Sequence, residues 1–162
     1  MSDIQNAFRL IGSLDLTSLS HDDTEEKIAA LCAKAVTPYG TTAAVCVYPE
    51  WVPLARKLLK KTPVKVATVV NFPAGGNDFK LMKDEIKKGL SGGADEIDAV
   101  FPYRDFLAGN TDSCRRFLDI IQRECGKHTS KIILETGELN HVSTIAAAVK
   151  LCLEYDIDFI KT

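Results

Sequence analysis

Short runs of apolar, mostly β-branched residues alternate along the chain with longer amphipathic segments. The short runs predict strands at residues 43–48, 65–70, 96–101, 131–135 and 157–161, with a shorter strand at 13–16. Most of these runs are almost continuously apolar rather than alternating with polar residues. That pattern is typical of parallel strands whose two faces are both covered.

The longer segments carry apolar residues at helical spacing. After Asp22, Asp23 and Thr24 comes EEKIAALCAKA, in which apolar and small residues recur at Ile28, Leu31, Cys32 and Ala35. Acidic residues at the beginning of a helix are stabilised by its dipole. Further helices are predicted at 50–60, 77–90, 111–125 and 141–155, and one more precedes the first strand.

The order of these elements is a repeated strand–helix unit. Two architectures suit it: a doubly wound open sheet and a (β/α)8 barrel. A complete barrel takes about 250 residues, and the 162 residues here are enough for about two-thirds of one. We expect residues 1–162 to form a single domain.

Charged residues interrupt the apolar strands, and strand alternation assigns them to shared faces. The residues that share a face are Glu96 with Asp98 and Val100, Lys131 with Ile133 and Glu135, and Lys161 with Ile157 and Phe159. Asp15 interrupts LDLT in the first strand. An unpaired buried charge costs several kcal/mol. We therefore infer that Asp15, Asp98, Lys131 and Lys161 face one another across a polar interior, which a barrel provides more readily than an open sheet.

Each of these residues also has a purely structural interpretation. Asp98 could bind a backbone amide or a lysine, and Lys131, near the start of its predicted strand, could extend to solvent. Lys161 follows IDFI at the carboxyl end of a strand, which is where strand–helix proteins build active sites. The four residues together favour function more strongly than any one of them.

The chemistry that such a set supports is Schiff-base catalysis. A lysine with an ordinary pKa of about 10.4 is protonated at pH 7. Desolvation and a neighbouring cation lower that pKa and free the amine to attack a carbonyl. The iminium withdraws electrons so that an adjacent carbon–carbon bond can break, and a carboxylate handles the proton transfers. This chemistry needs no metal and no organic cofactor.

Composition excludes several other classes of protein. The net charge is −2 and the chain has no long apolar run, which argues against nucleic-acid binding and a membrane span. The group Lys57, Lys60 and Lys61 is interpreted as a solvated helix face. Five cysteines without a CxxC pair fit reduced thiols and a cytoplasmic location, and the three histidines lack metal-ligand spacing.

Two local motifs have simpler interpretations. FPAGGNDF, at residues 72–79, matches neither dinucleotide nor Walker phosphate-binding patterns. We interpret it as a turn that leads to a helix cap at Asn77 or Asp78. Cys46 lies within an apolar strand, where a buried cysteine usually acts as a small hydrophobic residue.

Taken together, the motifs resemble the deoxyribose-phosphate aldolase family, which are class I aldolases with a (β/α)8 barrel. The matching segments are LDLT at 14–17, TTAAVCVYP at 41–49, NFPAGG at 71–76, GADEIDAVFPY at 93–103, KIILETGEL at 131–139 and DFIKT at 158–162. They occur in family order along the whole chain. The resemblance implies about the first six strand–helix units of a TIM barrel.

The resemblance also implies roles for individual residues. Lys161 is the implied Schiff-base lysine and Asp98 the implied carboxylate of the proton relay. Asp15, Thr17, Cys46 and Lys131 fall on positions that line the family's substrate site. The implied reaction is cleavage of 2-deoxy-D-ribose 5-phosphate to D-glyceraldehyde 3-phosphate and acetaldehyde, so the implied partners are small aldehydes and sugar phosphates.

Family members continue past DFIKT into two more strands, a second essential lysine and phosphate-binding loops. We therefore expect the sequence to be part of a longer product and its activity to be impaired, with Lys131 replacing the second lysine only in part. Unpaired strand edges also predict a homo-oligomer. The competing hypotheses are an inactive partial barrel that assembles through those edges and a different Schiff-base barrel enzyme of the transaldolase type.

Overall fold

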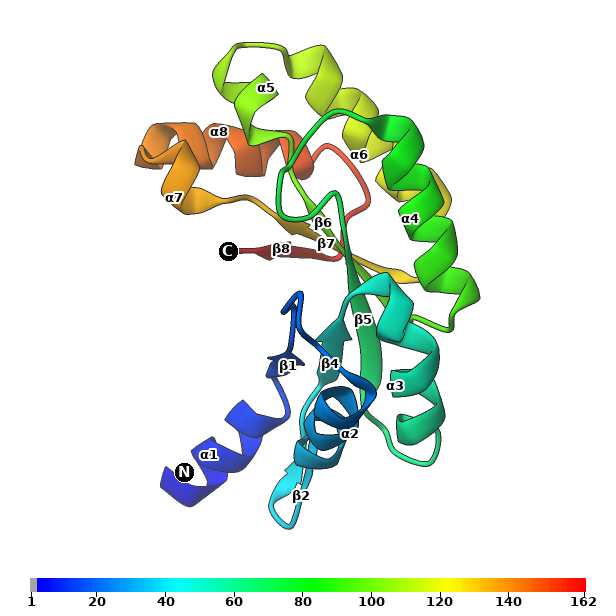
Figure 1. The fold of residues 1–162 in the computed structure, drawn as a ribbon. Helices are drawn as coiled ribbons and strands as arrows, with labels where there is room; N and C mark the ends of the chain where they lie inside the picture. Colours follow the sequence, from blue (N-terminus) through cyan, green and yellow to red (C-terminus); the bar gives the residue numbers. More distant parts are fainter. Residues whose placement is uncertain (1–2) are drawn as a thin grey trace.

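The computed structural model describes residues 3–162, and a six-stranded, all-parallel sheet organises them (Figure 1). The strands lie side by side in chain order: β1 (Asp15–Thr17), β4 (Ala44–Val47), β5 (Lys65–Val70), β6 (Glu96–Val100), β7 (Thr129–Ile133) and β8 (Phe159–Lys161). In this sheet all neighbouring strands are parallel, and each one pairs with the strand that follows it in the order given. This order is found in a (β/α)8 barrel, whereas a doubly wound sheet reverses its strand order in the middle.

Helices alternate with the strands, and the long helices after β1 lie on the convex side of the curved sheet, whereas the first helix, α1, precedes β1 and extends away from it (Figure 1). The helices are α1 (Asp3–Ile11), α2 (Glu25–Lys34), the 3-10 helix η1 (Pro49–Trp51), α3 (Val52–Leu59), α4 (Phe79–Ser91), α5 (Tyr103–Leu107), α6 (Thr111–Cys125), α7 (Thr136–Leu139) and α8 (Val142–Cys152). The six predicted strands and the predicted helices are confirmed, with boundaries that differ by a few residues. The short helices α5 and α7 and the hairpin of β2 (Val36–Thr37) and β3 (Gly40–Thr41) were not predicted.

One boundary changes the interpretation of a candidate residue. The strand predicted at 131–135 runs instead from Thr129 to Ile133, so Lys131 is its central residue. Lys131 is only 7% exposed, and the alternative in which it extends to solvent is wrong. Glu135 lies beyond the strand with a left-handed backbone (φ 56°), so it does not continue the face that Lys131 and Ile133 share.

Side-chain caps begin three of the long helices. Thr24 accepts a hydrogen bond from the Lys27 amide, Asp78 from the Leu81 amide and Asn110 from the Ser113 amide. Each cap satisfies an amide that the helix itself leaves unpaired. The prediction that FPAGGNDF is a turn leading to a helix cap is confirmed at Asp78.

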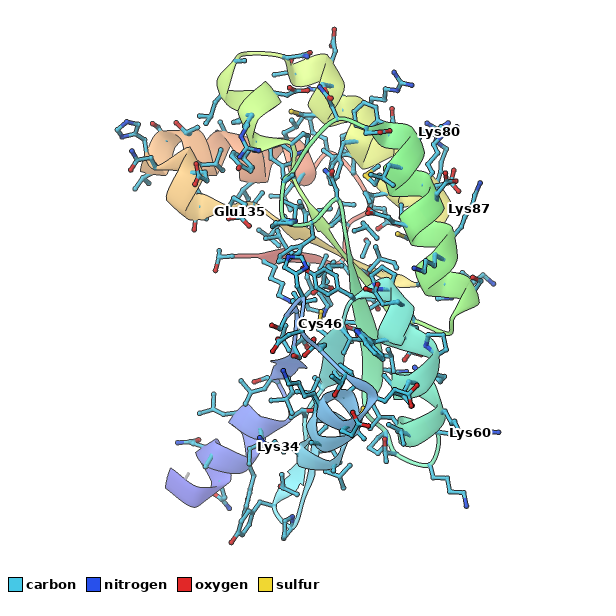
Figure 2. All side chains as sticks on the ribbon, in the orientation of Figure 1. Lys34, Cys46, Lys60, Lys80, Lys87 and Glu135 are labelled. Carbon is cyan, nitrogen blue, oxygen red and sulfur yellow. The ribbon has the colours of Figure 1, made fainter. Side chains whose placement is uncertain are left out.

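The main core lies between the convex face of the sheet and the helices. Phe101 and Phe117 are fully buried there and meet edge to face, with ring centroids 6.0 Å apart. Gly89 lets α4 approach β5 closely, because a Cβ at that position would lie 2.7 Å from Cγ2 of Thr68. Lys60, Lys80 and Lys87 point outward from this helical layer (Figure 2), and the predicted solvated face of Lys57, Lys60 and Lys61 is confirmed by their exposure.

The concave face carries a smaller apolar cluster of Ala44, Cys46, Ala67 and Val69. Figure 2 shows Cys46 on this side of the sheet. In the described part of the chain the sheet ends at β1 and β8, which pair on one side only. Within residues 3–162 no helix has both the length and the apolar character needed to cross a membrane.

Packing of α6 against the sheet predicts a large effect of truncating Phe117. The Phe117→Ala variant should lower the free energy of unfolding by about 3–5 kcal/mol, because it leaves a cavity in a close-packed layer. Denaturant titration followed by circular dichroism measures this. The same change at Phe8, which is 43% exposed, is the control. Equal effects at the two positions would contradict the assignment of the core.

Candidate active site

Five strands place charged or polar side chains on one patch of the concave face. The register pairs Asp15 with Ala44 and Thr17 with Cys46, and it pairs Asp98 with Lys131 across β6 and β7. Lys161 on β8 pairs with Ile133, which is two residues after Lys131 on β7 and therefore on the same face. Because inward-facing residues alternate along each strand, these side chains all project to the same side.

Two ammonium groups and three carboxylates form a continuous network there. Lys161 Nζ lies 2.5 Å from Asp98 Oδ2 and 3.5 Å from Asp15 Oδ2. Lys131 Nζ lies 2.6 Å from Asp15 Oδ2, 2.6 Å from Glu96 Oε2 and 3.4 Å from Asp98 Oδ1. The inference that Asp15, Asp98, Lys131 and Lys161 share one polar interior is therefore confirmed. The contact between Lys161 and Asp15 also joins β8 to β1, whose backbones are not paired.

Asp98 is the most enclosed member of the network. Its side chain is 0% exposed, and Oδ2 accepts the hydrogen bond from Lys161. No group among residues 3–162 donates a hydrogen bond to Oδ1, although the Lys131 ammonium group lies within ion-pair distance of it. A buried carboxylate with a spare acceptor atom beside a lysine can take a proton from a hydroxyl group or from water.

Two other candidates lie near the network and contact it less closely. Cys46 Sγ is 4.0 Å from Asp98 Oδ2, and the thiol is fully buried. Burial, followed by the negative charge of Asp98, raises the pKa of Cys46 to about 12. Thr17 lies at the exposed carboxyl end of β1, and its hydroxyl donates to the Asp15 carbonyl at 3.3 Å. Thr17 therefore lies on the concave face but outside the ion-pair network.

Glu96 is the site residue that the sequence analysis left out. It precedes Asp98 by two positions on β6 and contacts Lys131 as closely as Asp15 does. The signal was present in the alternation that puts Glu96 and Asp98 on one face. Glutamate side chains are mostly exposed in proteins, however, and the pairing of Glu96 depends on the position of Lys131 in the neighbouring strand.

The protonation of both lysines follows from the excess of carboxylates. Burial lowers the pKa of Lys161, but the hydrogen bond to Asp98 and the charge of Asp98 raise it, and the net shift is upward. For Lys131, burial again lowers the pKa, whereas the charge of Asp98 and the hydrogen bonds to Asp15 and Glu96 raise it further. Nearby anions outnumber nearby cations, so the pKa of Lys161 is raised rather than lowered in this arrangement.

A cavity of about 380 Å³ reaches both lysines. The cavity is lined by Gly12, Ser13, Asp15, Ala43, Glu96, Lys131, Phe159, Ile160 and Lys161. Many of these residues lie at or just before the amino ends of their strands, so the cavity opens on the amino-terminal side of the network. A separate cavity of about 340 Å³ between η1 and α4 contains none of the predicted site residues. Of these two cavities, only the first reaches the predicted site residues.

Within residues 3–162, no three or more His, Cys, Asp or Glu side chains are arranged to hold a metal ion. The groups that the site offers are an amine nucleophile, a buried carboxylate and a second ammonium group. These are the components of amine–carbonyl chemistry with proton transfer.

Comparison with known proteins agrees with this description. Residues 9–162 match the family model described as DeoC/LacD family aldolase. A protein of Coccidioides immitis assigned as a deoxyribose-phosphate aldolase superimposes with a TM-score of 0.89 at 29% identity, over 94% of this chain and 59% of its own. This likeness confirms the expectation of a partial (β/α)8 barrel. The chain thus spans under two-thirds of the length of that relative.

Other solved structures give the same result. The aldolase QR15 is 30% identical with a TM-score of 0.86, over 99% of this chain and 67% of its own. A Toxoplasma gondii protein assigned as a deoxyribose-phosphate aldolase is 29% identical with the same TM-score, over 98% of this chain and 61% of its own. A deoxyribose phosphate aldolase from Aeropyrum pernix, which is tetrameric, shares the fold at 24% identity.

The raised pKa of Cys46 predicts an unreactive thiol. At pH 8 a pKa of about 12 leaves about one molecule in 10⁴ as the reactive thiolate, far less than for a free cysteine. Alkylation of Cys46 by iodoacetamide, followed by peptide mass mapping, should be at least 100-fold slower in the folded chain than in urea. Asp98→Asn removes a charge that raises this pKa and should accelerate the reaction. Equal rates in the folded and unfolded chains would contradict the prediction.

Proposed function

The chain belongs to the DeoC/LacD aldolase family, and from that premise we propose that Lys161 is the Schiff-base lysine of a class I aldolase site. The proposed reaction is the reversible cleavage of 2-deoxy-D-ribose 5-phosphate to D-glyceraldehyde 3-phosphate and acetaldehyde. The observation that carries the proposal is the 2.5 Å contact between Lys161 Nζ and the fully buried Asp98. The solved relatives assigned as deoxyribose-phosphate aldolases support this substrate class.

The first step requires the amine of Lys161 to lose its proton. Asp98 is the nearest acceptor, and Asp15 lies 3.5 Å from the same nitrogen. The free amine attacks the aldehyde carbon of the open-chain sugar, and loss of water then gives an iminium. Because the pKa of Lys161 is raised, this step should become faster as the pH increases.

The second step breaks the carbon–carbon bond. A base removes the proton from the hydroxyl group on the carbon β to the iminium carbon, and the oxygen forms a carbonyl as the carbon–carbon bond breaks. The bond electrons move into the iminium, D-glyceraldehyde 3-phosphate leaves, and an enamine remains on the lysine. Asp98 is the proposed base, acting directly or through water, since it lies beside Lys161 and its Oδ1 accepts no hydrogen bond among residues 3–162. Protonation of the enamine and hydrolysis release acetaldehyde and restore the amine.

The remaining candidates are proposed to bind the substrate. Lys131 holds the anionic groups of the network together and presents a positive charge to the cavity. Asp15 orients both lysines, while Thr17 and Cys46 line the concave face around them. Within residues 3–162, β1 and β8 do not pair with each other, and we expect solvent between them to weaken the electrostatic control of the reaction.

Reductive trapping tests the identity of the nucleophile. Incubation with acetaldehyde followed by borohydride should leave an ethyl group on Lys161, identified by peptide mass mapping, because reduction converts the Schiff base to a stable amine. The Lys161→Arg variant keeps the positive charge and should lose this adduct, while Lys150→Arg, on the exposed side of α8, should not. An adduct that maps mainly to other lysines would exclude Lys161 as the Schiff-base residue.

A second candidate function is assembly without turnover. Phe159 on the edge strand β8 is 57% exposed, and β8 pairs only with β7 within the described residues. An edge strand with an exposed aromatic residue is a template for pairing with another chain. The proposed homo-oligomer would use this edge.

Light scattering distinguishes the two candidates. If β8 mediates assembly, Phe159→Lys should reduce the mass measured by size-exclusion chromatography with light scattering, since a charge on an edge strand disfavours strand addition. Leu153→Lys is the matched control, because Leu153 is also exposed but follows α8. A monomeric wild-type chain would exclude this candidate and leave the aldolase proposal unaffected.

A further inference from the structure

Glu96 occupies a position in the network that the catalytic scheme does not use. It lies 2.6 Å from Lys131, a distance equal to that of Asp15 from the same nitrogen. Its side chain is largely buried, at 14% exposure. Lys131 is thereby held between Glu96 and Asp15 and lies 3.4 Å from Asp98, while Lys161 has the close contact with Asp98.

The charges around the two lysines do not balance. The titratable groups that face them are Asp15 on β1, Cys46 on β4, Glu96 and Asp98 on β6, Lys131 on β7 and Lys161 on β8. With the carboxylates ionised, the lysines protonated and the thiol neutral, the network carries one net negative charge. Each anion favours the protonated form of a neighbouring lysine, so removal of one carboxylate affects both amines.

Resting on the proposed function, we propose that Glu96 is a positioning residue that holds Lys131 away from Asp98 and thereby determines how strongly Asp98 stabilises the protonated form of the Schiff-base lysine. Glu96 does not touch the reacting atoms in this scheme. It acts through Lys131, which is the cation that competes with Lys161 for the same carboxylate.

The direction of the effect follows from the geometry. If Glu96 is neutral, Lys131 loses one of its two closest anions and is drawn towards Asp98 Oδ1, which accepts no hydrogen bond from any described residue. Asp98 then divides its charge between two ammonium groups and stabilises protonated Lys161 less. Loss of the negative charge of Glu96 acts in the same direction. Both effects make Lys161 easier to deprotonate.

The experiment measures Schiff-base formation against pH. The wild-type chain and Glu96→Gln are exposed briefly to acetaldehyde at a series of pH values and quenched with borohydride, and the ethylated Lys161 peptide is quantified. The yield of ethylated Lys161 should rise with pH, and the pH at the midpoint of this rise should be lower by about half to one unit in Glu96→Gln than in the wild-type chain. Asp119→Asn, on the exposed side of α6, removes one charge outside the sheet and should leave the midpoint unchanged.

Two further variants separate the effect of charge from loss of structure. Glu96→Asp keeps the negative charge and should return the midpoint towards the wild-type value. Lys131→Met removes the competing cation and should move the midpoint upward, opposite to Glu96→Gln. If the substitutions merely destabilised the fold, the midpoint pH would shift in the same direction in Glu96→Gln and in Lys131→Met. Thermal melts of each variant, followed by circular dichroism, report whether the fold persists.

The outcomes distinguish this inference from the proposed function. Absence of an adduct on Lys161 in the wild-type chain contradicts the proposed function. An adduct on Lys161 whose midpoint is the same in Glu96→Gln and Asp119→Asn contradicts the role of Glu96 alone. Shifts of the same sign in Glu96→Gln and Lys131→Met also overturn it, whereas opposite shifts support it.

Discussion

The constraint on which this structure depends is that charges inside a curved apolar sheet must be paired. Removal of an ion from water costs several kcal/mol unless an opposite charge and hydrogen bonds replace the solvent. The concave face meets this constraint with two lysines and three carboxylates drawn from β1, β6, β7 and β8. The network joins the first strand to the last by side chains, where the backbones are not paired.

The same network controls the proposed chemistry. An amine nucleophile must be uncharged, but the surrounding carboxylates keep Lys161 protonated by raising its pKa. Any group that changes the balance of charge, whether a bound substrate, an added cation or a substitution at Glu96, therefore changes the reactivity of the amine. Asp98 is central because it is fully buried and contacts the amine most closely. The same two residues are thus a structural ion pair and the proposed catalytic pair.

Much of the fold could be predicted because its signals are local. Apolar runs marked the strands, helical spacing marked the helices, and Asp78 marked a helix start. The hairpin of β2 and β3 was missed because two-residue strands carry no periodicity. The boundary of β7 was misplaced because the apolar run KIIL extends past the last paired residue, and pairing with β6 rather than composition sets that end.

The residues that share a face could be read from their spacing alone, since successive side chains of an extended strand point to opposite faces. That was sufficient to select Asp15, Asp98, Lys131 and Lys161 as one set, and the resemblance added Thr17 and Cys46. The pairs that meet, the membership of Glu96 in the network and the upward shift of the Lys161 pKa emerge only when the strands are packed together. Those properties depend on distances between strands that are far apart in the chain, because electrostatic interaction depends on separation in space and on burial rather than on separation in sequence.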